Sequence, residues 1–387
     1  MARTVLNEEI LEAAVAGGSF YGGGGGGSPE LGRKLGKMAL EIKRAGKSPS
    51  GQALTLLDLD DLPGDALLLT VSAVGSPAGK GYHAGPEEYA RAVEFFREKT
   101  GLEVAGLIAN ECGGLATVNG WIQSAGTGLS VVDAPCNGRA HPTGIMGSMG
   151  LHRVKGYESI QAVVGGSREA GTYLEALVQG SLSFADSVVR QAAAYTGGLV
   201  AVARNPVTVS YAREHNAAGA ISLCIRVGKA MLEAGHGEDR IRAAAEASGG
   251  YVALKGVVAV KRLVSAGGFD TGVLIVESGD GAYEITFWNE YITLERTERG
   301  GSGHPAGSAQ TAGSGRSERL ATFPDLIATL DLCSGFPVSS AEVKEGQGIA
   351  VVVVPRSELI LGAGVKDPEL YAPVEQAVGK DIVRYVF

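Results

Sequence analysis

Six consecutive glycines at positions 22–27 constrain this chain more than any other feature. Each glycine loses more backbone freedom on folding than any other residue, so six in a row are unfavourable unless the fold needs backbone without side chains. Ser28 and Pro29 follow at once and are typical of a helix N-cap and first turn. The run therefore predicts a flexible loop that presents backbone N–H groups beside a positive helix end, where a carboxylate, a phosphate or an oxyanion would bind. A surface linker is the alternative.

The residues around the glycine run disfavour both familiar nucleotide-binding loops. A P-loop ends in Gly-Lys-Ser/Thr, whereas these glycines lead into Ser28-Pro29-Glu30. A dinucleotide fingerprint follows a strand, whereas residues 7–15 have the pattern of a capped helix with acids in its first turn. We therefore expect no nucleotide cofactor.

Charge and composition exclude several classes of protein. The chain has 387 residues and 45% hydrophobic content, which is enough for two domains or one large one. Its net charge of −8 argues against a nucleic-acid partner, and no apolar run approaches the roughly 20 residues that span a bilayer. The four cysteines are far apart, which disfavours a disulfide framework and favours a cytoplasmic location. We also expect a small-molecule substrate and a homo-oligomer.

The first half of the chain alternates between strand and helix patterns. Near-continuous apolar runs at 52–57, 66–71, 104–109 and 129–132 predict short buried strands of a mostly parallel sheet. Each of the last three is followed by a polar, glycine-rich loop. Because ligands of open α/β sheets bind outside the carboxyl ends of the strands, these loops are expected to share one crevice. That crevice would contain Glu111, Asp133, Asn137, Arg139 and His141.

The second half changes to a pattern of strands. Apolar runs at 256–260, 272–276, 283–287 and 348–354 follow a group of predicted helices. The predicted fold is therefore of the α/β class, with an N-terminal α/β domain over residues 1–166. A helical and β-rich C-terminal domain is expected over residues 167–387. Within it, the Gly/Ser-rich stretch 300–317 is predicted to be a mobile loop.

Seven segments together match one known pattern, in the right order and over most of the chain. The glycine run with Ser28-Pro29 is similar to an LGTGGGGDPY-type loop, and Gly75-Ser76-Pro77 to a GAP loop. Glu111-Cys112-Gly113-Gly114 with Asn119 resembles an E-I-G-G-x-N segment whose asparagine is shifted here by three positions. The remaining matches lie at 131–142, 219–223, 287–290 and 324–327. These segments resemble the S-methyl-thiohydantoin desulfurase-like family. The resemblance implies a β-rich second domain and activity on hydantoin- or thiohydantoin-like rings.

The chemistry implied by that resemblance assigns roles to the crevice residues. A thiohydantoin desulfurase adds water to the ring carbon that bears sulfur and expels a thiol, which requires a base or a metal and donors for the developing charge. We expect Glu111, Asp133 and His141 to be catalytic, as acid and base or as ligands of a divalent metal such as zinc. For each acid the alternative is a structural hydrogen bond to loop amides. The expected substrate-binding residues are Gly24, Gly25, Gly26, Ser28, Gly75, Gly113, Gly114, Asn119, Asn137, Arg139 and Asn289.

Two functional hypotheses follow. The first is a cytoplasmic hydrolase of a cyclic amide or thioamide, with its site between the strand ends and the β-rich domain. The second is a non-catalytic or ligand-binding subunit of a hydantoinase/oxoprolinase-like assembly, which the shifted Asn119 and the lack of an acid after Pro142 would allow. In either case Cys112 and Cys136 are reactive thiols or, as is common for free cysteine, buried and inert.

Overall fold

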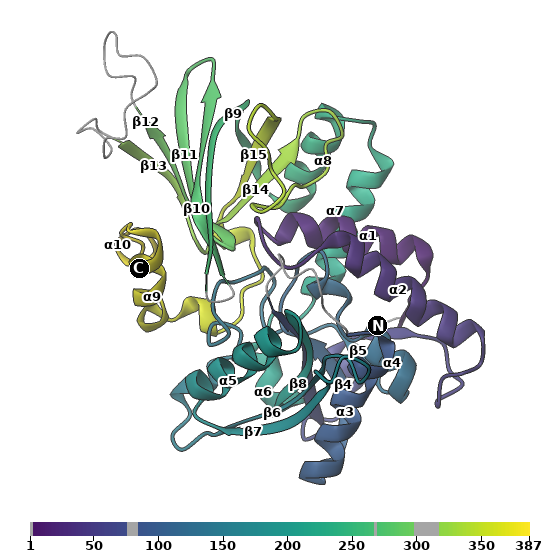
Figure 1. The fold of residues 1–387 in the computed structure, drawn as a ribbon. Helices are drawn as coiled ribbons and strands as arrows, with labels where there is room; N and C mark the ends of the chain where they lie inside the picture. Colours follow the sequence, from purple (N-terminus) through teal and green to yellow (C-terminus); the bar gives the residue numbers. More distant parts are fainter. Residues whose placement is uncertain (1–2, 76–83, 267–268, 298–316) are drawn as a thin grey trace.

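Two β-sheets and the helices packed between and around them make up the structure (Figure 1). The computed structural model describes residues 3–75, 84–266, 269–297 and 317–387. The stretch 300–317, expected to be a mobile loop, lies outside the described residues except for Ser317. The Ser76 and Pro77 of the expected GAP loop also lie outside them.

The first sheet has eight strands in the order β1-β2-β5-β4-β3-β8-β6-β7. The pairs β2–β5, β5–β4 and β4–β3 are parallel, and the other pairs are antiparallel. The sheet is therefore mixed rather than mostly parallel, and its parallel part carries the predicted site loops. The strands are β1 Thr4–Val5, β2 Thr55–Leu57, β3 Leu67–Gly75, β4 Val104–Ala109, β5 Ser130–Val132, β6 Ser159–Gly165, β7 Leu174–Gly180 and β8 Leu199–Thr208.

Strand β8 is the central element that the sequence analysis did not predict. It pairs antiparallel with both β3 and β6. Val200 and Val202 pack in one cluster with residues of α5, whereas Ala201 and Ala203 pack on the opposite side in the cluster that contains α3. Because helices cover both faces of the strand, its residues 199–203 are all apolar rather than alternating with polar ones.

The helices around the first sheet begin where their capping residues predict. Asn7 Oδ1 accepts a hydrogen bond from Ile10 N at 2.9 Å, and Ser28 Oγ accepts one from Leu31 N at 3.3 Å, so both expected N-caps are confirmed. The helices of this part are α1 Glu8–Tyr21, α2 Pro29–Arg44, α3 Pro86–Thr100, α4 Trp121–Thr127, α5 Leu182–Tyr195 and α6 Val209–His215.

The second sheet has seven strands, all antiparallel, in the order β13-β12-β11-β10-β9-β15-β14. Strand β14 also contacts β12 and β13 at the other end of this order, so the sheet curls into a half-barrel. The predicted β-rich second domain is confirmed. Its strands are β9 Tyr251–Ala266, β10 Phe269–Ser278, β11 Gly281–Trp288, β12 Glu290–Thr297, β13 Ser317–Thr322, β14 Leu326–Asp331 and β15 Gly348–Val354.

A layer of helices joins the two sheets. Helix α7 (Ala220–Glu233) crosses α1 so closely that a Cβ on Gly17 would lie 1.8 Å from Cys224 O. Helix α8 (Glu238–Ser248) packs on β9 and β15, and the short helices α9 (Ala372–Val378) and α10 (Val383–Val386) end the chain. One continuous core holds α1 together with strands of both sheets.

The expected domain boundary at residue 166 stays a prediction, although the first sheet continues past it through β7 and β8. Within the described ranges, no helix is both long and apolar enough to cross a bilayer.

Candidate functional site

The six glycines form a packed seam rather than the flexible loop expected from their composition. A Cβ on Gly24 would lie 2.9 Å from the Tyr291 ring, and one on Gly25 would lie 2.0 Å from Glu290 Oε1. A Cβ on Gly26 would lie 2.5 Å from the Cα of Gly113, and the φ angle of Gly26 is +75°. Side chains are therefore excluded here by close neighbours, and at Gly26 also by backbone conformation.

The carbonyls of the run bind both domains. Gly23 O accepts a hydrogen bond from Tyr291 N at 2.7 Å, and Gly24 O accepts one from Ser340 N at 2.9 Å, so both are tied to the second domain. Gly26 O accepts from Leu115 N at 3.1 Å and from Ala116 N at 3.2 Å in the first domain. The run thus joins the two halves of the molecule by its backbone.

A cavity of about 300 Å³ lies beside this seam. It is bounded by the glycine run, by the ends of β3 and β4, and by the turn that enters β12. Eight predicted site residues line it: Gly25, Gly26, Ser28, Gly75, Glu111, Asn119, His141 and Asn289. The expected crevice between the strand ends and the second domain therefore exists, and small molecules bind in cavities of this size.

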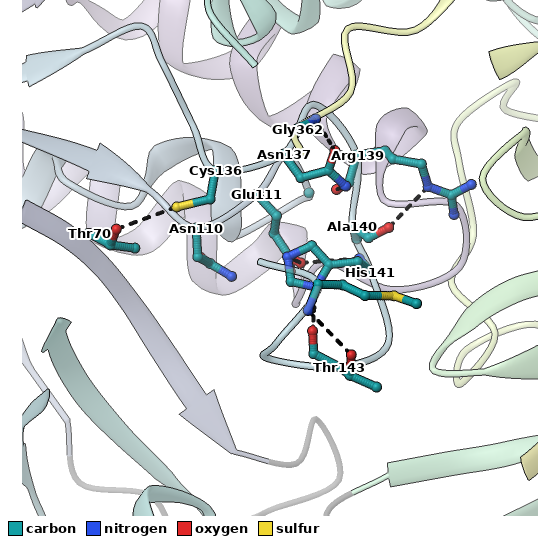
Figure 2. A network of polar contacts seen from close by, with 12 residues as sticks. Thr70, Asn110, Glu111, Cys136, Asn137, Arg139, Ala140, His141, Thr143 and Gly362 are labelled. Atoms are coloured by element: carbon teal, nitrogen blue, oxygen red, sulfur yellow. Dashed lines mark hydrogen bonds and ion pairs between the residues drawn. The ribbon is translucent and has the colours of Figure 1, made fainter. Parts of the chain in front are cut away.

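Glu111 and His141 meet inside the cavity (Figure 2). His141 N donates to Glu111 Oε2 at 3.2 Å, and His141 Nε2 lies 3.3 Å from the same oxygen. His141 Nδ1 lies 3.0 Å from Thr143 O, and because a carbonyl only accepts, Nδ1 carries the ring hydrogen. Burial lowers the pKa of His141 to about 4, so its imidazole is neutral at pH 7.

Glu290 supplies a second carboxyl group to the cavity from the start of β12. Burial raises the pKa of Glu290 to about 7, opposed by the charge of Arg139 and by backbone N–H groups, including that of Gly26. Burial, followed by the charge of Glu290, raises the pKa of Glu111 to about 8. Both carboxyl groups therefore keep their protons to a higher pH than exposed glutamates do, and the charge of Glu290 further favours the protonated form of Glu111.

Amide and guanidinium groups complete the lining. Asn119 Nδ2 donates to Asn110 Oδ1 at 3.4 Å, which places two amides beside the acids. Arg204 of β8 lies 3.4 Å from Asp186 Oδ1, and Arg190 donates to the same carboxylate at 3.1 Å. The cavity is therefore polar on the sheet side, with both cations and hydrogen-bonding amides.

Asp133 does not reach this cavity. Its Oδ1 accepts from Ile221 N at 2.8 Å and its Oδ2 from Ser222 N at 3.0 Å, so the carboxylate caps the first turn of α7. Asp133 therefore makes structural hydrogen bonds to backbone amides, which was the alternative to a catalytic role. Asp133 is not brought together with Glu111 and His141, and the described residues contain no cluster of three or more His, Cys, Asp or Glu side chains suited to a metal. The expected ligand set does not fit a metal, and no step below involves one.

Arg139 and Asn137 hold the chain rather than line the cavity. Arg139 is fully buried, and it donates through Nη1 to Pro324 O at 3.2 Å and through Nε to Ala140 O at 3.0 Å. Asn137 donates to Arg139 O at 2.8 Å and accepts from Gly362 N at 3.0 Å (Figure 2). Both therefore link the loop after β5 to the C-terminal part of the chain.

Gly24, Gly113 and Gly114 also lie outside the cavity lining. A Cβ on Gly113 would lie 2.3 Å from Gly26 Cα, and one on Gly114 would lie 2.8 Å from Gly27 O. They are required by backbone packing. Cys112 and Cys136 are buried, and burial raises the pKa of Cys136 to about 11, as expected for an inert thiol.

Sequence reasoning omitted several cavity residues from the predicted site. Glu290 directly follows the predicted Asn289, and the sequence indicates that it can reach the crevice from the second domain, although it is not among the predicted site residues. Asn289 has a positive φ of +57°, and its Oδ1 accepts from Asp270 N at 2.8 Å, which orients the turn that carries Glu290. Arg204, Asp186 and Arg190 had no local signal, because the strand β8 and helix α5 that carry them are far in sequence from the glycine-rich loops.

Two family models match the chain. The N-terminal domain of the S-Me-THD-like family matches residues 9–170, and the C-terminal domain of the same family matches residues 180–363. A comparison with curated proteins gave no match. A crystal structure of a protein from Chromobacterium violaceum is similar over 96% of this chain and 97% of that one, with a TM-score of 0.66 and 19% identity. At that identity the likeness shows a shared fold.

Proposed function

The chain belongs to the S-Me-THD-like family, and from that membership and the cavity we propose that it hydrolyses a cyclic amide or thioamide. The expected substrate is an S-methyl-thiohydantoin or a hydantoin ring. The observation that carries the proposal is the pair of buried glutamates, Glu111 from the first domain and Glu290 from the second, which line one cavity and both have raised pKa values. The reaction is assigned to the cytoplasm, in keeping with four unpaired cysteines.

The two glutamates have complementary roles in this reaction. The Glu290 carboxylate takes a proton from water as the water oxygen bonds to the ring carbon that bears sulfur. The Glu111 carboxylic acid gives its proton to the adjacent ring nitrogen, so a neutral tetrahedral intermediate forms. In the second step the new hydroxyl returns its proton to Glu111, the carbon–sulfur bond breaks, and protonated Glu290 gives its proton to the departing thiolate. The products are the hydantoin and methanethiol, and both acids are restored.

The remaining cavity residues would orient the ring and keep Glu111 protonated. The amides of Asn110 and Asn119 offer donors and acceptors that match the N–H and C=O groups of a hydantoin. Neutral His141 has its Nε2 lone pair 3.3 Å from Glu111 Oε2, an arrangement that favours the protonated carboxyl group. His141 is therefore assigned a positioning role beside Glu111.

A panel of substrates tests the proposal. Purified protein is incubated with an S-methyl-thiohydantoin, a hydantoin and a dihydropyrimidine, and thiol release and ring opening are followed by a thiol reagent and by mass spectrometry. Glu290→Gln and Glu111→Gln should lose turnover, whereas Glu30→Gln, an exposed acid in the first turn of α2, should not. The pH profile of turnover should be bell-shaped, rising as the pair of glutamates loses its first proton and falling as it loses its second, with both limbs above the usual pKa of a glutamate.

The alternative of a non-catalytic subunit predicts a different result. A ring compound would then bind without turnover, Glu111→Gln and Glu290→Gln would have no effect on the activity of a partner enzyme, and a second protein would co-purify in stoichiometric amount. Thiol release by the purified chain alone contradicts this alternative.

A further inference from the structure

Strand β7 ends the first sheet with an unprotected edge. It is the last strand in the sheet order, so within the described part of the chain no strand pairs with its outer side. Its seven residues contain neither Lys nor Pro, its one charged residue, Glu175, is paired with Arg91, and its register with β6 is continuous, without a bulge. Natural sheets usually protect an edge of this length with one of those devices. The opposite edge strand, β1, has only two residues.

Helix α5, which packs on β7, has an exposed apolar stripe. Phe184 and Tyr195 are 67% and 80% exposed, and the half-buried Val188 lies between them at helical spacing. Two residues along a helix correspond to a rotation of about 200°, so this stripe lies opposite Asp186 and Arg190. Those two side chains line the cavity, and the stripe therefore lies on the flank that faces away from it.

The stripe and the strand edge are continuous. A Cβ on Gly180, the last residue of β7, would contact the Phe184 ring at 4.0 Å. Ala192 of the helix and Val178 of the strand pack together against the same buried cluster. Leu177 of β7 is itself 38% exposed. Helix α5 and strand β7 lie side by side at the margin of the sheet (Figure 1), so the strand edge and the exposed apolar side chains of the helix form one surface.

The sequence of β7 is complementary to itself in the antiparallel direction. A two-fold axis perpendicular to the sheet keeps each side chain on its own face, so one residue must lie directly opposite its own copy, with the axis midway between the two. Only Leu177, the fourth of seven residues, pairs the whole strand. In that register Glu175 lies opposite Gln179, Ala176 opposite Val178, and no like charges face each other.

We propose that the edge of β7 and the stripe of α5 form a two-fold interface with a second copy of this chain. The two β7 strands would pair antiparallel around Leu177 and continue the first sheet across the dimer. The stripes of Phe184, Val188 and Tyr195 would cover one another on the helix side, because paired strands place the two α5 helices on the same face. A second copy is favoured over a different protein by the self-complementary register. The inference does not depend on the proposed function.

Molecular mass in solution and site-specific cross-linking test this surface. Light scattering should give about twice the chain mass of 39.6 kDa. The double variant Leu177→Lys/Phe184→Asp should give half the wild-type mass, whereas Val264→Glu, an equally exposed apolar position on β9, should not change it. Circular dichroism and the melting temperature check that the double variant is folded.

Cross-linking keeps the proposal testable if that variant fails to fold. In a Cys333→Ser background, which removes the exposed cysteine, Leu177→Cys should form a disulfide-linked dimer on mild oxidation, and Val264→Cys should not. A monomer at all concentrations, a dimer that survives the double variant, or cross-linking at 264 but not at 177 would each overturn the proposal.

Discussion

The segments after β4 and β5 start from matching positions and end in different environments. The two strands are parallel neighbours, and each is followed within two residues by an acid, Glu111 in one case and Asp133 in the other. Glu111 enters the cavity beside His141, whereas Asp133 binds the N–H groups of Ile221 and Ser222. An acid at the end of a parallel strand is therefore not enough to identify a functional site. The segments that pack against that strand end decide whether the acid faces a cavity. The N-terminus of α7 packs against the end of β5, whereas the end of β4 borders the cavity.

The largest expected effect is a loss of turnover when either acid that lines the cavity, Glu111 or Glu290, is replaced. Glu290→Gln or Glu111→Gln should lower kcat by about 10²–10⁴-fold, because each removes one proton-transfer group while keeping its shape. Asp133→Asn should leave turnover per folded molecule unchanged. Steady-state kinetics on a responsive ring compound, with the folded fraction measured by circular dichroism, makes the comparison. A kcat loss for Asp133→Asn equal to that for Glu111→Gln would abolish the distinction between the two segments.

The next effect concerns the stability of the fold, which depends on the close packing of Gly26 against Gly113 after β4. Gly26→Ala should destabilise the fold by about 2–5 kcal/mol, since it adds strain at positive φ to a clash with Gly113 Cα. Gly46→Ala also has a positive φ but no neighbour within 4 Å, so it serves as the control for strain alone, at about 1 kcal/mol. Urea unfolding measures both. If both variants lost the same free energy of unfolding, the packing of Gly26 against Gly113 would tolerate a methyl group.

A smaller effect is expected from the helix cap. Asp133→Ala should cost about 1–2 kcal/mol, because it removes the acceptor for two N–H groups of α7. Asp133→Asn, which keeps one acceptor oxygen, should cost less. Denaturant unfolding at pH 7 measures both variants. An Asp133→Ala variant that unfolds like the wild type would contradict the capping role.

The last effect is a difference in pH dependence between the two acids. The folded pKa of Glu111 is raised from 4.5 to about 8, so folding favours its protonated form and stability falls as pH rises from about 4.5 through 8. Glu111→Gln removes this loss and should be more stable than the wild type at pH 9 by roughly 1–3 kcal/mol. Burial also raises the pKa of Asp133, but three hydrogen bonds oppose it, so the stability of Asp133→Asn relative to the wild type should change less between pH 5 and 9 than that of Glu111→Gln. Melting temperatures from pH 5 to 9 test the order.

Local patterns predicted the elements better than the contacts between them. Strand β4 has the bounds expected from its apolar run, and the caps at Asn7 and Ser28 lie where the sequence indicates. Those features depend on neighbouring residues alone. The role of Asp133 depends on Ile221, 88 residues later, and nothing near Asp133 in the sequence reveals it.

The same reason explains what was missed in the site. Glu290 and Arg204 lie in segments far from the glycine run, and the cavity collects them only after both sheets have formed. Of the three glycines predicted to bind substrate from this run, Gly25 and Gly26 line the cavity and Gly24 does not. Its packing against Tyr291 and Gly113 is a property of the assembled structure rather than of the run itself.

The position of β8 has a consequence for how this chain can be divided. A fragment that stops at residue 166 would end before β7 and β8, so β3 would lose its antiparallel neighbour and β6 would lose both of its partners. Such a fragment would expose the open side of β3 and detach β6 from the sheet. We therefore expect that an insertion, truncation or gene fusion near the middle of the chain must keep residues 174–208 with the N-terminal part.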